Sequence, residues 1–107
     1  MSTSTRVGRI VTFTAKPGRG EQLAIVMLQI AEALRGSMGC ELYAVTRECG
    51  AADRVRVVEV WTDLSSADAA LATAVATHPD IDLNDLLELL VEPPEQLDLD
   101  PLGGVGI

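Results

Sequence analysis

Aromatic residues are scarce in this chain of 107 residues, which contains one Phe, one Trp and one Tyr. Histidine occurs once, cysteine twice, and every lysine and arginine lies before position 57. Eight of the sixteen acidic residues fall between Asp80 and Asp100, so the last third of the chain is purely anionic. This segment would repel a phosphate backbone, and no basic stripe with interleaved aromatics occurs elsewhere. We therefore expect no nucleic-acid partner.

Long apolar runs are also absent, although 48% of the residues are hydrophobic. No run approaches the roughly 20 residues that a membrane-spanning helix needs. The first residues, MSTSTRVGRI, lack the apolar core and cleavage site of a signal peptide. We expect a cytoplasmic protein without membrane contact, folded as one domain over residues 1–107 with its core at about 7–100 and a tail at 101–107.

Two cysteines and one histidine are too few and too dispersed for a metal or disulfide framework. If residues 40–48 form one strand, Cys40 and Cys49 lie about 30 Å apart at about 3.3 Å per residue. That separation is far beyond the reach of a disulfide. Cys49 and His78 together supply too few ligands for zinc. We expect two free thiols, as in a reducing compartment, with no metal and no cofactor.

Periodicity in the sequence predicts seven elements. Residues 7–15 alternate as a strand, and from 21 to 35 apolar residues recur as one helical stripe formed by Leu23, Met27, Ile30 and Leu34. The further elements are strands at 40–48 and 54–61 joined by a loop at 49–53, helices at 67–77 and 83–90, and a strand at 95–100. Ser65 or Ser66 is expected to cap the second helix. The tail after this last strand is expected to be loosely attached.

The order β-α-β-β-α-α-β predicts an α+β, ferredoxin-like fold in which helices cover one face of a four-stranded antiparallel sheet. The strand at 54–61, however, is apolar on both faces, with Val57 and Trp61 on one side and Val58 and Val60 on the other. Strands of this kind are buried on both faces. Because the chain has no residues left for a second layer, we expect a homodimer in which two sheets pack face to face.

Several segments in sequence order resemble one known family. PGRG precedes the first helix, and GCELYAVTRE, RVVEVWTD and LLELLVEPPEQLDL follow it. From Val7 to Leu99 the chain resembles the antibiotic biosynthesis monooxygenase family of dimeric α/β-barrel proteins. The resemblance implies a substrate pocket between the sheet and the helices. Many members are thought to oxidise phenolic or anthrone-like compounds to quinones with O₂, without flavin or metal.

The resemblance leads us to expect a cofactor-independent monooxygenase that oxidises an aromatic polyketide, anthrone or quinol to a quinone with O₂. The alternatives are a non-oxygenase dimer of the same fold that binds a small metabolite or cyclises a polyketide, and a structural or regulatory dimer with a filled pocket. Val57 stands where members that make actinorhodin-type quinones have asparagine, so the same substrate is not implied.

Trp61 and His78 are the candidate catalytic residues. The Trp61 indole N–H can hydrogen-bond a substrate oxygen while its ring packs on a polycyclic plane, or the residue can simply plug the core. Histidine is the ordinary proton acceptor near neutral pH, but His78 stands at a helix end, where an exposed histidine is common.

Glu59, Tyr43, Thr12 and Thr14 are the candidate substrate-binding residues. Glu59 shares a face with Trp61 because side chains alternate along a strand. A bare charge there would be costly, so Glu59 is expected to pair with Arg47 or Arg9, with a part in catalysis as the alternative. Threonine on a strand is also an ordinary β-former.

Overall fold

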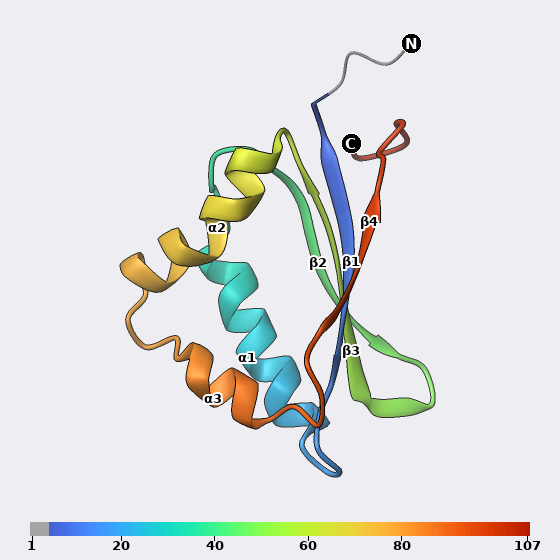
Figure 1. Cartoon of the computed structure of the whole chain (residues 1–107), viewed down its shortest axis with the longest axis vertical. Helices are drawn as coiled ribbons and strands as arrows, with labels where there is room; N and C mark the ends of the chain where they lie inside the picture. Colours follow the sequence, from blue (N-terminus) through green and yellow to red (C-terminus); the bar gives the residue numbers. More distant parts are fainter. Residues whose placement is uncertain (1–4) are drawn as a thin grey trace.

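The computed structural model describes residues 5–107 and contains the seven predicted elements in the predicted order (Figure 1). They are β1 (Val7–Thr14), α1 (Gly20–Ala33), β2 (Cys40–Glu48), β3 (Ala51–Trp61), α2 (Leu64–Thr77), α3 (Leu83–Glu88) and β4 (Glu95–Leu99). The strands lie in the order β2-β3-β1-β4, and every neighbouring pair is antiparallel. This arrangement confirms the α+β, ferredoxin-like fold with a four-stranded antiparallel sheet.

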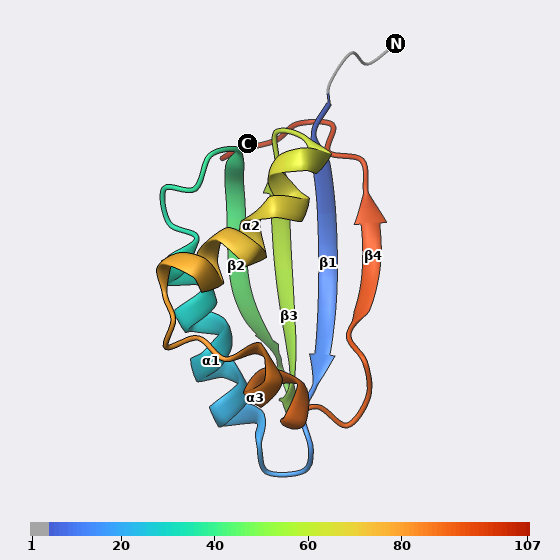
Figure 2. The same cartoon turned by 60° about the vertical axis from the view of Figure 1, so that its left-hand side comes forward.

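The three helices lie together on one face of the sheet, which we call the inner face (Figures 1 and 2). The stripe predicted for α1 packs toward this face, and all of its members are buried: Leu23, Met27, Ile30 and Leu34. In α2 the buried residues are three alanines, Ala67, Ala70 and Ala74. Because alanine carries a single methyl group, α2 fills less of the space above the sheet than α1. None of the helices in the described part of the chain is long and apolar enough to cross a membrane.

Two local predictions are wrong. The hairpin between β2 and β3 is shorter than the expected loop at 49–53, since Glu48 pairs with Ala51 across the two-residue turn Cys49-Gly50. Gly50 has a φ of +82°, a conformation that glycine adopts without steric cost. The cap of α2 is neither Ser65 nor Ser66. Instead, the Asp63 carboxylate accepts a hydrogen bond from the Ser66 backbone N–H at 2.7 Å, which starts the helix at Leu64.

The start of α1 is fixed to β3 by Asp53. Its carboxylate oxygens accept hydrogen bonds from the backbone N–H groups of Gly20 at 2.9 Å and Gly18 at 3.2 Å. A side chain at Gly20 would not fit, because a Cβ there would lie 2.0 Å from the Ala52 carbonyl oxygen. A carboxylate from a neighbouring strand therefore takes the place of a local cap and sets where α1 crosses the sheet.

The outer face of the sheet, turned away from the helices, carries two apolar rows. Side chains paired in register form one row from Ala44, Val58, Ile10 and Leu97, and the next from Leu42, Val60, Gly8 and Leu99. Leu97 on the edge strand β4 is 59% exposed, and Leu99 is 40% exposed. As predicted, β3 therefore presents apolar residues to both faces of the sheet.

After β4 the tail turns back over one end of the outer face (Figure 2). The Pro101 ring lies against Gly8, where a Cβ would be only 3.1 Å from Pro101 Cγ. The contact is limited, because Leu102 is 87% exposed and Val105 is fully exposed. The tail therefore covers the rim of the outer face and leaves the apolar row through Ile10 and Leu97 uncovered.

Candidate functional site

A cavity of about 320 Å³ lies between the inner face of the sheet and the three helices. Its walls are mostly apolar, with Phe13 from β1, Met27 and Ile30 from α1, and Leu86 from α3 among them. The short side chains of Ala67 and Ala70 form the part that α2 contributes, together with Leu71. The alanine-rich sequence of α2 is thus the reason that space remains under this helix.

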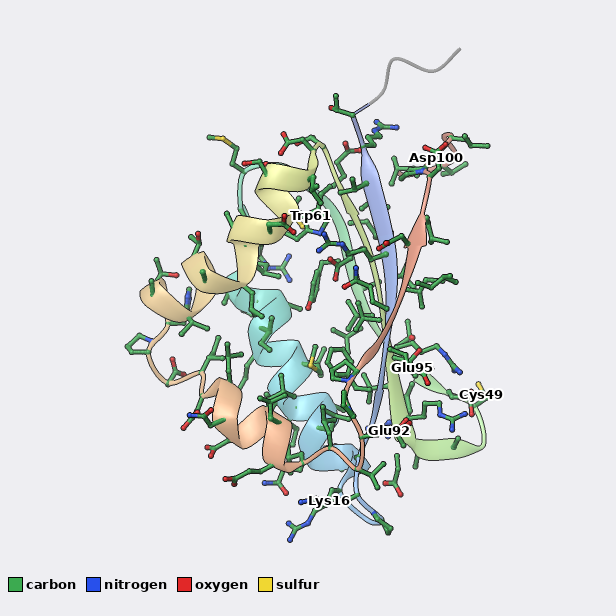
Figure 3. The ribbon with its side chains drawn as sticks, in the orientation of Figure 1. Lys16, Cys49, Trp61, Glu92, Glu95 and Asp100 are labelled. Atoms are coloured by element: carbon green, nitrogen blue, oxygen red, sulfur yellow. The ribbon has the colours of Figure 1, made fainter. Side chains whose placement is uncertain are left out.

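Trp61 closes the cavity at the end of β3 and is 1% exposed. Figure 3 shows it between α2 and the sheet, far from Cys49 at the tip of the β2–β3 hairpin. Among the described residues, Trp61 is the largest side chain that is fully buried. The large indole ring therefore forms one end wall of the cavity.

Polar side chains enter the cavity as a single row across three strands. Glu59 on β3 pairs in register with Arg9 on β1 and with Tyr43 on β2, and all three residues line the cavity. Residues directly opposite each other in an antiparallel pair lie on the same face, with Cα atoms about 4.5–5.5 Å apart. The strand register therefore brings a carboxylate, a guanidinium and a phenol together on an otherwise apolar wall.

Glu59 is held through one of its two oxygens. Its Oε1 accepts a hydrogen bond from Trp61 Nε1–H at 3.0 Å and lies 3.8 Å from Arg9 Nη1. No hydrogen bond to Oε2 is present within residues 5–107. Because Glu59 lines the cavity and its Oε1 is already engaged, we expect a bound molecule to contact the carboxylate through Oε2.

Burial raises the pKa of Glu59 above its ordinary value of 4.5. The hydrogen bond from Trp61 and the positive charge of Arg9 act in the opposite direction, but they do not offset the loss of hydration. The carboxylate is thus a stronger base than a solvent-exposed glutamate.

Arg9 connects the sheet to the helix that covers it. Its Nη2 donates to Asp68 Oδ1 on α2 at 3.0 Å, while its Nη1 faces Glu59. The Arg9 side chain is 15% exposed and that of Asp68 is 63% exposed. The buried end of this network faces the cavity, whereas the Asp68 end lies at the surface, where an ion pair contributes little to stability.

Tyr43 supplies a hydrogen-bond donor to the cavity. Burial, and then the negative charge of Glu59, raise the pKa of the Tyr43 hydroxyl far above its ordinary value of 10. The phenol therefore keeps its proton at physiological pH, so it can donate to an oxygen of a bound molecule but cannot act as a base there.

The structure brings together three of the six candidate residues and separates the others. Trp61, Glu59 and Tyr43 line the cavity. His78 instead caps the C-terminal end of α2, is exposed, and has its Nδ1 3.0 Å from Thr77 Oγ1. Thr12 and Thr14 alternate with the cavity-lining residues of β1 and so point to the outer face. The geometry therefore gives His78, Thr12 and Thr14 no contact with the cavity.

Glu59 pairs with Arg9, one of the two partners expected from the sequence, whereas Arg47 pairs with Glu21 at 2.9 Å. Arg9 and Gln96 also line the cavity, and neither was a candidate for the site. Alternation along β1 could have identified Arg9 as a cavity residue, because Arg9 lies on the same face of the strand as Val11 and Phe13. For Gln96 the signal is its pairing with Val11, which only the folded sheet reveals.

Within residues 5–107, no group of three or more His, Cys, Asp and Glu side chains is arranged to hold a metal ion. Cys40 is partly buried and Cys49 is exposed, and both are free thiols. The polar groups of the cavity are thus those of Arg9, Tyr43, Glu59, Trp61 and Gln96.

Comparisons with known proteins agree with this fold. The sequence profile of a family described as antibiotic biosynthesis monooxygenase matches residues 6–78. A solved structure from Nitrosomonas europaea, described as a proposed antibiotic biosynthesis monooxygenase, superposes with a TM-score of 0.79 at 16% identity, covering 95% of each chain. A protein of Pseudomonas aeruginosa gives a TM-score of 0.72 at 25% identity, covering 96% of this chain and 100% of the other.

A third structure, from Chloroflexus aurantiacus, carries the same proposed description and gives a TM-score of 0.65 at 24% identity over 92% of this chain and 95% of that one. A comparison with curated proteins finds no significant match. These structural likenesses show the α+β, ferredoxin-like fold. The family profile covers more than half of the sequence. The chain therefore belongs to the antibiotic biosynthesis monooxygenase family.

Proposed function

We propose that this protein is a cofactor-independent monooxygenase that oxidises a small aromatic substrate, such as an anthrone, a quinol or an aromatic polyketide, to a quinone with O₂. The observation that carries the proposal is the apolar cavity of about 320 Å³ with one polar row, Arg9, Glu59 and Tyr43, on its wall. Its family membership supports the reaction class.

The chemistry suits an apolar cavity of this kind. Once an anthrone or quinol loses a proton, its electron-rich anion can reduce O₂ directly. With an anthrone, one oxygen atom of O₂ enters the quinone and the other leaves as water, whereas a quinol passes two electrons and two protons to O₂, which leaves as hydrogen peroxide. The protein need only exclude water, orient the ring and stabilise the charge on the substrate oxygen. The apolar walls provide the first two, and the Tyr43 hydroxyl provides the third.

The size of the cavity limits the substrate. Small-molecule pockets range from roughly 300 to 1,000 Å³, so this cavity lies at the lower end of that range. We infer that the substrate has few fused rings, because Trp61 and α1 leave no room for a long polycyclic system. We therefore expect substrates no larger than an anthrone, with three fused rings.

We also propose that the protein is a homodimer in which two sheets pack through their outer faces. The support is the apolar row of Ala44, Val58, Ile10 and Leu97, in which Leu97 is exposed and the other three are only partly buried in an isolated chain. Contiguous exposed apolar surface of this kind marks an interaction site. A symmetric pairing would bury the same residues of both copies.

A non-oxygenase that binds a small metabolite or cyclises a polyketide remains the second candidate. The favouring observation is that Glu59 already accepts the hydrogen bond of the Trp61 indole N–H. The indole is therefore not free to stabilise a peroxide, as an oxygenase role for Trp61 would require. In this alternative the cavity holds the ligand without reaction with O₂.

Oxygen consumption with anthrone and with a simple hydroquinone, in chelator-treated buffer, tests the proposal. We expect uptake above the uncatalysed rate and formation of anthraquinone or benzoquinone. Trp61 is the sole tryptophan and lines the cavity, so quenching of its fluorescence reports binding independently of turnover. Quenching by both compounds without any uptake would refute the oxygenase and support the binding function.

A further inference from the structure

Oxidation of an anthrone or quinol by O₂ begins with loss of a proton, and the cavity must offer a group that accepts it. The titratable side chains that line the cavity are those of Arg9, Tyr43 and Glu59. A guanidinium is always protonated in proteins, so Arg9 cannot accept a proton. The Tyr43 phenol keeps its own proton, as described above. His78 lies outside the cavity, at the end of α2.

Glu59 has the geometry that a proton acceptor needs. Its Oε1 is fixed by the Trp61 indole N–H at 3.0 Å and by Arg9 at 3.8 Å, so the carboxylate plane is held in place. Its Oε2 has no hydrogen-bond partner among residues 5–107 and belongs to a side chain that lines an apolar cavity. A base must come within hydrogen-bond distance of the proton it removes, and Oε2 is the oxygen that can do so.

We propose that Glu59 Oε2 is the proton acceptor of the reaction, and that Tyr43 donates a hydrogen bond to the substrate oxygen on which negative charge then accumulates. The two residues are paired in register on neighbouring strands, so both can contact one ring. Trp61 and Arg9 act as positioning residues for the carboxylate. The inference deepens the proposed function and rests on it for the class of substrate.

An anthrone is oxidised to the quinone in a sequence of steps that begins and ends with the Glu59 carboxylate. Glu59 takes a proton from the ring CH₂, leaving an anion whose charge lies on the carbonyl oxygen near Tyr43. One electron passes to O₂, and the resulting superoxide combines with the carbon radical to form a peroxide anion. Glu59 returns its proton to this peroxide. Loss of water, which takes the second CH₂ hydrogen and breaks the O–O bond, leaves the quinone and the original carboxylate.

Charged and titratable groups from several elements surround Glu59. Its neighbours on the sheet are Arg9 on β1 and Tyr43 and Cys40 on β2. Two further carboxyl groups lie next to Arg9: Asp68 on α2 forms an ion pair with it, and Asp98 on β4 pairs with it in register. Burial and the Glu59 charge raise the pKa of the Cys40 thiol, so Cys40 stays neutral beside it. The ionisation of Glu59 itself is therefore the one expected to govern proton abstraction below neutral pH.

Exchange of the anthrone CH₂ protons in D₂O, followed by ¹H NMR without O₂, measures proton abstraction separately from oxidation. We expect wild-type protein to accelerate exchange and Glu59→Gln to lose at least about 100-fold of that rate, which is the lower range for a general base. The matched control is Glu41→Gln. Glu41 is also a poorly exposed carboxylate paired with an arginine, Arg6, but it does not line the cavity.

The outcomes separate the two proposals. Exchange without O₂ uptake would refute the oxygenase function and leave Glu59 as the base, whereas equal exchange by wild type and Glu59→Gln, or none by wild type, would overturn the role of Glu59. A positioning role alone would weaken anthrone binding, measured by Trp61 fluorescence, and leave exchange at saturation unchanged. If Glu59→Gln does not fold, the wild-type pH profile decides: a rate that rises with one ionisation above pH 4.5 supports Glu59, and a flat rate refutes it.

Discussion

Replacing Leu97 by Asp tests whether the outer face joins two copies. Leu97 lies on the edge strand β4, pairs with Ile10 and is 59% exposed in the single chain. A substitution there removes little packing within one copy. If two outer faces meet, however, this side chain becomes buried in each copy.

The structure sets the size of the effect. Full burial of a leucine side chain contributes about 1.5–3 kcal/mol, so burying the exposed 59% of Leu97 contributes about 1–2 kcal/mol. A symmetric dimer contains this contact twice, which gives about 2–4 kcal/mol. Since 1.4 kcal/mol is a factor of ten, we expect the dimer Kd to rise by about 30-fold to several hundred-fold. Desolvation of the two new carboxylates adds to this loss.

Sedimentation velocity over a series of protein concentrations measures the Kd directly. The control is Leu64→Asp, which introduces the same charge at a leucine that is 54% exposed but lies at the start of α2 on the helix side. We expect the control to remain a dimer. If wild type sediments as a monomer, or if Leu97→Asp has the same Kd as wild type, the face-to-face arrangement is refuted.

Three further results are expected. Asp53→Ala removes two hydrogen bonds at the start of α1 and should lower the free energy of unfolding in urea by about 1–2 kcal/mol, whereas no change would show that α1 is capped otherwise. Because the pKa of Glu59 is raised, this residue holds a proton in the folded state at pH values where the unfolded chain has released it, so the free energy of unfolding should fall as pH rises above 4.5. Glu59→Gln should remove this decline. An unchanged decline in the variant would contradict the assignment to Glu59. His78→Ala should leave O₂ uptake unchanged, and a large loss would place His78 in the reaction.

The sequence is sufficient for the fold because its periodicities are regular and agree with one another. The helical stripe from Leu23 to Leu34 and the alternation in β3 each admit a single element type, and the order of elements then leaves one sheet topology. The two local errors, in the cap of α2 and in the length of the β2–β3 turn, occurred where a single residue determines the local structure. Asp63 outcompetes two neighbouring serines for the start of α2, and Gly50 permits a turn of only two residues.

The site is less predictable because it depends on the register between neighbouring strands of the sheet. Alternation alone places Glu59 and Trp61 on one face. Arg9 aligns with Glu59 through the pairing of β1 with β3, which α1 and β2 separate in the sequence. Tyr43 aligns with Glu59 across the β2–β3 hairpin, where a register shift at Arg47–Glu48 changes which residues face each other. A single sequence specifies neither register. Thr12 and Thr14 were misplaced because nothing local says which face of β1 the helices cover. His78 was plausible by chemistry, but the end of α2 directs it into solvent.

The part of α2 that covers the cavity has a consequence for how substrate range can diverge within this architecture. Ala67 and Ala70 of α2 line the helix side of the cavity, whereas the groups proposed to act on the substrate lie on the sheet, across the cavity. A longer side chain in place of one of these alanines would reduce the cavity volume without changing the polar row on the sheet. Size selectivity and chemistry are therefore encoded by different segments of the chain, so selection can tune one while the other is preserved.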